Sequence, residues 1–382
     1  MQLKNILPLA AAQAVASQSL TDVLAQNNST LSTLGSLLAA NPNIVSALTS
    51  ASNITILAPN NDAFSTFLNS SSGSSMDPSA VAALLTYHVL NGTYYASNFT
   101  DAEGAVFAPT LLTNASYSNV TGGQRVEVMV QDGGVHVFSG LGFNSTVVTP
   151  NVNFTGGTIH VIDRVLTLPP TPADALVSSN LTALAGALTA ADLVDTVSSL
   201  QDVTIFAPTN AAFDAIGAAV ANLTTEQLAG ILTYHVVQGV VGYSTALANG
   251  SLTTVNGANV TVTVGDDGAV WVNSARVVVA DVLVANGVVH VIDNVLNPAN
   301  STAKPDDTAA TTSNAPAFTA TGTGTAGVPF TSGVPTPTST APVASGTQTT
   351  SPSGSGNAGV PVRTAAVGAA ALFGGAAVLV NL

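Results

Sequence analysis

The sequence contains no cysteine, which excludes disulfide scaffolds, thiol catalysis and cysteine-ligated metal sites. Charged residues are also scarce, at 7% of the chain against about 25% in average soluble proteins. Only six residues are Lys or Arg while twenty are Asp or Glu, so the formal net charge is −14. A chain without a basic footprint is not expected to bind nucleic acid. Something other than charge must keep its surface hydrated.

The N-terminus has the pattern of a secretory signal peptide, which we assign to residues 1–16. Lys4 supplies the positive start, a mostly apolar run follows, and Ala14-Val15-Ala16 fits a cleavage site of small residues. The apolar run is too short to span a bilayer. The alternative interpretation is a buried N-terminal helix.

Residues 358–382 are interpreted as a signal for attaching a glycosylphosphatidylinositol (GPI) lipid, which is removed in the mature protein. A run of small residues, a short spacer and an apolar, Ala- and Gly-rich tail follow one another in the order that this signal requires. We predict attachment at Asn357, with Gly356 or Ser355 as alternatives. A genuine membrane-spanning tail is the competing interpretation.

Sequons of the form Asn-x-Ser/Thr are the most frequent motif, with fifteen copies. Asn27 overlaps the next sequon and Asn53 directly precedes an apolar strand, so neither is expected to be modified. We expect glycans on Asn28, Asn69, Asn91, Asn98, Asn114, Asn119, Asn144, Asn153, Asn180, Asn222, Asn249, Asn259 and Asn300. Bulky hydrophilic glycans would then hydrate the surface in place of charge.

Residues 301–357 differ from the rest because Thr, Ser, Pro, Ala and Gly dominate them. They contain too little apolar mass to fold. Ser/Thr-rich sequence with Pro is typical of an O-glycosylated stalk, so this part is predicted to be a disordered tail.

An internal repeat organises residues 17–300 and predicts two domains, residues 17–168 and 169–300. The first copy is longer, and its extra length follows Gly92. Three segments recur in order, namely Thr55–Phe64 and Thr204–Phe213, Leu85–Val89 and Leu232–Val236, and Ile159–Leu166 and Val289–Leu296.

Each copy is predicted to place helices first and an antiparallel sheet afterwards, an α+β arrangement. Asp77 before Pro78 predicts a helix start, and Thr224 with Gln227 predicts a capping box at the equivalent helix. After each Tyr-His pair the apolar period changes to two, as in Val260–Val264, which predicts strands.

These three recurring segments resemble the fasciclin (FAS1) domain family. The resemblance implies two tandem β-sandwich or β-wedge domains of about seven strands with packed helices. It also implies extracellular adhesion or matrix roles, often with a GPI anchor, and the overall layout looks most like a fungal surface protein. In some animal relatives the central Tyr-His region is implicated in integrin binding, which by resemblance marks Tyr87, His88, Tyr234 and His235 as binding residues.

The candidate chemistry is sparse. Pairing His88 with His160, and His235 with His290, would give a metal site in each copy. We favour the alternative, in which each imidazole makes local hydrogen bonds and no metal or cofactor is bound. Asp163 and Asp293 follow a His by three residues, so they are expected to accept hydrogen bonds at a turn rather than to form a His–Asp catalytic pair.

Asp101 with Glu103 would be the only glycosidase-like pair, and the second copy has no equivalent. No Gly-x-Ser-x-Gly nucleophile motif and no phosphate-binding loop occur, so we do not expect an enzyme. The expected function is adhesion or cell-wall and matrix interaction at the cell surface, with surface proteins or glycans as partners and a lipid link to the membrane. A module for a small ligand or carbohydrate is the alternative, and a hydrolase is the minor one.

Overall fold

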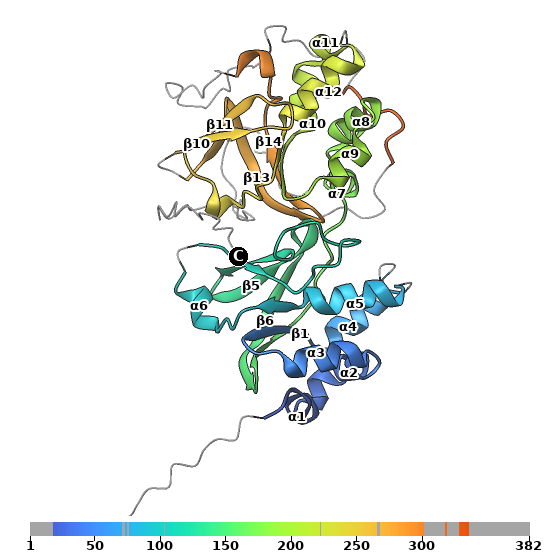
Figure 1. Ribbon diagram of the computed structural model, residues 1–382, viewed down its shortest axis with the longest axis vertical. Helices are drawn as coiled ribbons and strands as arrows, with labels where there is room; N and C mark the ends of the chain where they lie inside the picture. The colour runs from blue at the N-terminus through green and yellow to red at the C-terminus, as the bar shows by residue number, and fades with distance from the viewer. Residues whose placement is uncertain are drawn as a thin grey trace, which may run out of the picture.

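The computed structural model of the chain describes residues 18–301, except 71, 72, 75, 103, 222, 266 and 267, together with Phe318 and residues 328–335. The predicted signal peptide, the GPI signal with Asn357, and most of the predicted stalk lie outside these residues, as do Glu103 and Asn222. The described part forms two domains that follow one another along the long axis, each with most of its helices on the same side, while α6 of domain 1 lies on the opposite side (Figure 1).

Domain 1 alternates short helices with strands. Its helices are α1 (Leu20–Gln26), α2 (Asn28–Ala39), α3 (Pro42–Ser50), α4 (Asn61–Leu68), α5 (Pro78–Tyr87), α6 (Ala96–Thr100) and the 3₁₀ turn η1 (Gly140–Gly142). Its strands are β1 (Ile54–Pro59), β2 (Val89–Asn91), β3 (Val106–Pro109), β4 (Arg125–Gln131), β5 (Gly134–Phe138), β6 (Asn144–Phe154) and β7 (Gly157–Ile162).

Domain 2 repeats this order. Its helices are α7 (Pro172–Ser178), α8 (Thr182–Ala190), α9 (Val194–Ser199), α10 (Asn210–Ala215), α11 (Gly217–Val220), α12 (Thr225–Tyr234) and the 3₁₀ turns η2 (Ser244–Ala246) and η3 (Pro298–Asn300). Its strands are β8 (Val203–Pro208), β9 (Val236–Gln238), β10 (Gly250–Thr253), β11 (Asn259–Val264), β12 (Val270–Val272), β13 (Ala275–Val284) and β14 (Gly287–Ile292).

The two seven-stranded sheets share one topology. Their strand orders are β2-β1-β7-β6-β5-β4-β3 and β9-β8-β14-β13-β12-β11-β10. The predicted antiparallel sheet is wrong at one pairing in each domain, because β1 lies parallel to β7 and β8 lies parallel to β14. Nearly a whole domain separates the strands of each parallel pair, which gives the long crossover that parallel pairing needs. Bridges Leu90–Thr110 and Val237–Thr254 bring the two edges together, so each sheet is nearly closed.

The predicted helix starts are confirmed in atomic detail. The Asp77 carboxylate accepts hydrogen bonds from the backbone N–H groups of Ser79 and Ala80, with Pro78 in the first turn. Thr224 and Gln227 form the reciprocal capping box of α12. Both α5 and α12 are thereby fixed at the start and run directly into the Tyr-His pair, which places that pair at the same point of each domain.

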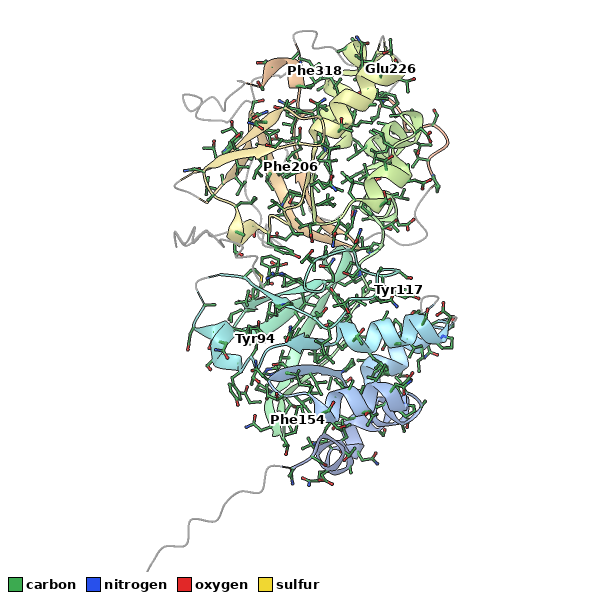
Figure 2. The ribbon with its side chains drawn as sticks, viewed as in Figure 1. Tyr94, Tyr117, Phe154, Phe206, Glu226 and Phe318 are labelled. Atoms are coloured by element: carbon green, nitrogen blue, oxygen red, sulfur yellow. The ribbon has the colours of Figure 1, made fainter. Side chains whose placement is uncertain are left out.

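Each domain has an apolar core between helices and sheet and a second core inside the curled sheet. Tyr87 and Phe99 fill the inside of the first sheet, while Phe206 and Tyr234 fill the second. Figure 2 shows Phe206 within domain 2 and Phe318 at the end of that domain far from domain 1. No helix among the described residues is both long and apolar enough to cross a membrane.

A short piece of the predicted stalk packs against the helices of domain 2. Phe318 joins the apolar core there, and Val328, Phe330 and Val334 pack on its edge. The Phe330 ring meets Phe213 of α10 edge to face, with centroids 6.3 Å apart. These four apolar side chains attach the described part of the stalk to domain 2.

Gly186 of α8 tests the contact between this helix and Phe330, and Gly35 of α2 in domain 1 serves as the control. A Cβ on Gly35 of α2 meets no heavy atom within 4 Å, so Gly35→Ala is expected to stabilise domain 1 by about 0.5–1 kcal/mol through helix propensity. A Cβ on Gly186 of α8 would overlap the Phe330 carbonyl oxygen. Gly186→Ala is therefore expected to displace residues 328–335.

Urea unfolding measures the first effect, and hydrogen exchange of the backbone amides in residues 328–335 measures the second. Faster exchange is expected in the Gly186→Ala variant only. Unchanged exchange there would mean that Phe330 does not lie on α8.

Candidate functional site

The Tyr-His pairs close α5 and α12 and are buried. Tyr87 and Tyr234 are 0% exposed, and His88 and His235 are 4% and 2% exposed. Each His is the C-terminal cap of its helix, at the point where the chain turns into β2 or β9. The four residues implied as binding residues therefore lie beneath the surface, and their direct contact with a partner stays a prediction.

Both ring nitrogens of each capping histidine are occupied by backbone. His88 Nδ1 donates to the Leu84 carbonyl oxygen at 2.7 Å, and its Nε2 accepts from the Leu166 N–H at 2.9 Å. Because a carbonyl can only accept and an amide N–H can only donate, the ring is the neutral Nδ1–H tautomer. The ring adds a second hydrogen bond to the Leu84 carbonyl, which also accepts from the His88 backbone N–H, and joins the end of α5 to the segment after β7.

The capping histidine of the second copy makes the same two hydrogen bonds. His235 Nδ1 donates to the Ile231 carbonyl oxygen at 2.8 Å, and the Leu296 N–H donates to Nε2 at 2.9 Å. Burial, partly offset by the bond to the helix carbonyl, lowers the pKa of His88 and of His235 from 6.5 to about 4. The neutral ring is therefore part of the folded structure.

The remaining repeat histidines are also used structurally. His160 Nε2 donates to the Tyr94 carbonyl oxygen at 2.8 Å, and burial lowers its pKa. His290 Nε2 donates to the Gly242 carbonyl oxygen at 2.7 Å. Within the described residues no three His, Asp or Glu side chains gather in a way that could hold a metal ion. With both nitrogens of His88 and His235 engaged, the paired-histidine metal sites have no free ligand atom on these two residues.

Asp163 and Asp293 accept hydrogen bonds at a turn, as the sequence predicts. Asp163 accepts from the Thr146 N–H at 2.7 Å, and Asp293 accepts from the Arg276 N–H at 2.8 Å. Both bonds hold the start of the long strand, β6 or β13, against the end of the last strand. Asp101 is exposed at the end of α6, and its proposed partner Glu103 is outside the described residues.

Most sequon asparagines are exposed, as a glycan acceptor must be. Asn119 and Asn300 are half-buried, and Asn222 is not described. The exposed acceptors are Asn28, Asn69, Asn91, Asn98, Asn114, Asn144, Asn153, Asn180, Asn249 and Asn259. Their occupancy stays a prediction.

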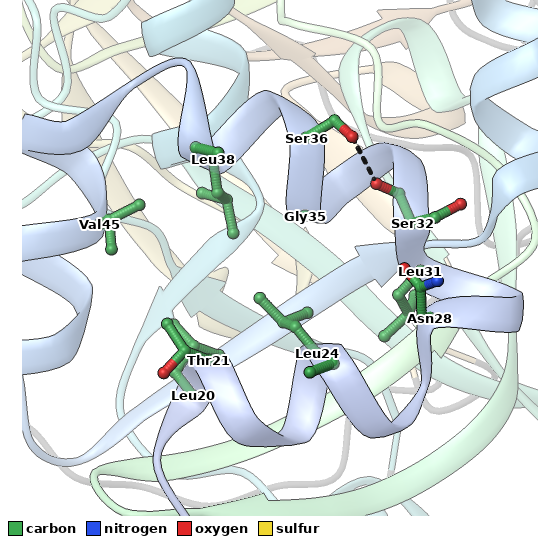
Figure 3. A pocket seen from close by; sticks show the side chains of 12 residues that line it. Leu20, Thr21, Leu24, Asn28, Leu31, Ser32, Gly35, Ser36, Leu38 and Val45 are labelled. Atoms are coloured by element: carbon green, nitrogen blue, oxygen red, sulfur yellow. Dashed lines mark hydrogen bonds between the residues drawn. The ribbon is translucent and has the colours of Figure 1, made fainter.

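A hollow of about 380 Å³ lies between the first helices of domain 1 (Figure 3). Its walls come from α1, α2 and Val45 of α3, and leucines such as Leu20, Leu24 and Leu31 supply much of the lining. Gly35 opens the α2 wall because it has no side chain. The volume lies within the range of small-ligand pockets.

The junction between the domains is a site that the sequence pattern does not reveal. Phe107 of β3 stacks on Tyr243 with ring centroids 4.5 Å apart, and the Arg125 guanidinium lies 5.4 Å from the Tyr243 ring centre. Arg125 also donates to the Phe107 carbonyl oxygen at 3.0 Å. A cation over an aromatic face is attractive, more so when water is excluded.

Tyr87 connects the Tyr-His pair of domain 1 to this junction between the domains. Its hydroxyl donates to the backbone oxygen of Arg125 at 3.1 Å, which fixes the start of β4. Burial first, and the neighbouring Tyr243 second, raise the pKa of Tyr87 well above its ordinary value. In domain 2 the equivalent Tyr234 hydroxyl donates to the Asn259 oxygen at 2.8 Å, where no further domain follows among the described residues.

Comparison with protein families matches the fasciclin domain over residues 29–169 and 179–298. The chain is 39% identical over 279 residues to a fasciclin-like arabinogalactan protein of Arthroderma benhamiae, a match that covers 72% of this chain and 66% of that one, a little under two thirds of its length. It is 34% identical over 275 residues to a fasciclin-like arabinogalactan protein of Phaeosphaeria nodorum, covering 72% and 86%.

Among solved structures the chain is similar to a FAS1 domain pair from the insect cell adhesion molecule fasciclin I. That similarity has 21% sequence identity, a TM-score of 0.36, and covers 71% of this chain and 98% of the insect chain.

Proposed function

We propose that this chain, which belongs to the fasciclin domain family, is a cell-surface glycoprotein that mediates adhesion or contact with the cell wall or matrix. The observation that carries the proposal is that the repeated Tyr and His side chains make structural hydrogen bonds within their own domains. Tyr87, Tyr234, His88, His160, His235 and His290 all bond to the backbone of their own domain. Groups committed in this way hold a scaffold together, so interaction falls to the domain surfaces.

The proposal includes no enzymatic activity and an attachment to the membrane by the GPI lipid at Asn357. Surface or matrix proteins and glycans are the proposed partners. The relatives named as fasciclin-like arabinogalactan proteins support this setting. We keep a binding role for the Tyr-His regions as part of the proposal, with the contact made by surface residues that Tyr87, His88, Tyr234 and His235 hold in place.

Deletion of the gene tests the proposal. Loss of adhesion to a wall or glycan-coated surface is expected, with recovery when the full chain is restored. Phospholipase treatment should release the protein from intact cells. Unchanged adhesion and wall integrity after deletion would count against the proposed role, while retention after phospholipase treatment would count only against the lipid link.

A second candidate function is the binding of a small apolar ligand in the hollow of domain 1. The hollow's volume and leucine lining favour it. Gly35→Phe is expected to fill the space, because Gly35 lines the hollow and an added Cβ there meets no heavy atom within 4 Å. We expect the fluorescent probe N-phenylnaphthylamine to bind the full chain and to lose binding in this variant. Gly230→Phe in α12 is the matched control in domain 2, and equal probe binding in all three proteins would remove this candidate.

A further inference from the structure

The loop that joins β3 to β4 is longer in domain 1 than its counterpart in domain 2. It spans residues 110–124, whereas β10 and β11 are joined by residues 254–258. The added length lies against domain 2. Gln124 at its end is fully buried and donates to the Val284 carbonyl oxygen. The insertion that the repeat comparison places after Gly92 thus builds much of the junction between the domains.

Asn119, in the middle of this loop, bonds to domain 2 through three of its atoms. Its backbone N–H donates to the Ala285 oxygen at 2.8 Å, and its backbone oxygen accepts from the Asp202 N–H at 3.2 Å. Its side-chain Nδ2 donates to the carbonyl oxygens of Ser199 and Leu200, both at 3.2 Å. These two carbonyls belong to the last residue and the C-terminal cap of α9, and the Leu200 oxygen also accepts from Asn286 Nδ2 of domain 2 at 2.9 Å.

The sequon partner of Asn119 is engaged as well. The Thr121 hydroxyl donates to one oxygen of the Asp202 carboxylate at 2.6 Å, and the Thr121 N–H donates to the other at 2.7 Å. Hydrogen bonds to a carboxylate are short and strong. Both side chains that define this sequon are therefore committed to domain 2.

N-glycosylation uses the same Nδ2 atom. The transfer forms a bond from Nδ2 to the first sugar's C1, breaks the bond from that carbon to the lipid diphosphate of the oligosaccharide donor, and removes one amide proton. The sugar would then replace one of the two Nδ2 hydrogens that are donated to the Ser199 and Leu200 carbonyls. Both N···O distances are 3.2 Å, those of direct hydrogen bonds, so a sugar in place of one hydrogen removes at least one of these bonds and is incompatible with the contact as it stands.

The face of domain 2 that contacts domain 1 can be compared with the equivalent face of domain 1, which is uncovered. Asp202, Tyr243 and Leu283 of domain 2 face domain 1. Their repeat equivalents in domain 1 are Asn53, Tyr95 and Asn153, which are exposed. The two asparagines are both sequon residues. At these positions domain 1, which is uncovered, has two sequon asparagines, whereas domain 2, which is covered, has Asp202 and Leu283.

We propose that a glycan on Asn119 and the docked arrangement of the domains exclude each other, so that the docked protein has an unmodified Asn119. This differs from the prediction of a glycan there from sequence. The unmodified asparagine holds the two domains together through its hydrogen bonds. Its modification yields a chain whose two domains are separated.

Site occupancy in the full chain from a secreting eukaryotic host tests the proposal directly. The compact monomer is isolated, its N-glycans are trimmed to a single N-acetylglucosamine, and the peptides that carry residues 114 and 119 are weighed by mass spectrometry. Asn114 is the matched control, since it is exposed in the same loop. The tag is expected on Asn114 and at least about tenfold less on Asn119. Similar occupancy of both in the compact fraction overturns the proposal.

A second measurement does not depend on the host's glycosylation. Because the chain has no cysteine, Asn119→Cys and Asn114→Cys each introduce a single thiol. A polyethylene-glycol maleimide is expected to label position 119 at least about tenfold more slowly than position 114 in the native protein. Equal rates in a chain whose X-ray scattering stays compact overturn the proposal. Equal rates with expanded scattering support it, because docking is then lost together with the amide.

Discussion

Acidification is expected to destabilise each domain by about 3 kcal/mol between pH 6.5 and pH 4, through His88 in domain 1 and His235 in domain 2. The folded-state pKa of each ring is lowered to about 4 from an unfolded value of 6.5. Below pH 6.5 the unfolded chain takes up a proton that the folded chain does not, so the free energy of unfolding falls as the pH falls. The contribution is fully present above pH 6.5.

The physical reason lies in the bonds of the ring. A proton on Nε2 of His88 would point at the Leu166 N–H, so the existing hydrogen bond would become a repulsion between two donors. No solvent is available to the buried ring to stabilise the positive charge. The same reasoning applies to His235 and Leu296.

Urea unfolding at several pH values between 7.5 and 4 measures this effect. The double variant His88→Gln, His235→Gln is the control, because it keeps the carboxylates that titrate in the lower part of the range. We expect the variant to be less stable at pH 7 and to lose less stability on acidification. Parallel pH profiles for the two proteins would contradict the assignment of the effect to these histidines.

Replacing Tyr243 by Ala is expected to loosen the contact between the domains by about 3–5 kcal/mol. The ring is 5% exposed, stacks on Phe107 and lies under the Arg125 guanidinium. Its removal would leave a cavity in the junction and take away the aromatic face that Arg125 contacts. Faster proteolysis at the interdomain link and expanded X-ray scattering would report the loosening.

The repeat supplies the matched control. Tyr95 is the equivalent residue of domain 1 and is 43% exposed, so Tyr95→Ala should cost well under 1 kcal/mol. Tyr243→Phe is a second control, because the Tyr243 hydroxyl is buried without a hydrogen-bond partner and its loss should be nearly neutral. Similar losses for Tyr243→Ala and Tyr95→Ala would mean that the junction does not depend on this ring.

Local signals were readable from the sequence because they act over a few residues. Asp77 with Pro78, and Thr224 with Gln227, satisfy orphan N–H groups of their own helix, so the helix starts follow from spacing alone. The repeat, the two-domain fold and the turn roles of Asp163 and Asp293 follow from patterns written twice. The local hydrogen bonding of the histidines was also expected, although not their partners.

Other features depend on contacts between residues far apart in the chain. The parallel placement of β1 beside β7 is invisible to local periodicity, since a strand's alternation is the same whatever the direction of its neighbour. The burial of Tyr87 and His88, which the family resemblance marks as binding residues, arises from the nearly closed sheet.

The sequence by itself determined that this protein is a duplicated, sparsely charged chain with capped helices and many sequons, because composition, spacing and repetition are properties of the chain alone. Only the tertiary structure decided which of two equivalent residues is free and which is buried. Tyr95 and Tyr243 occupy the same place in their domains, and they differ because a neighbouring domain covers only one of them.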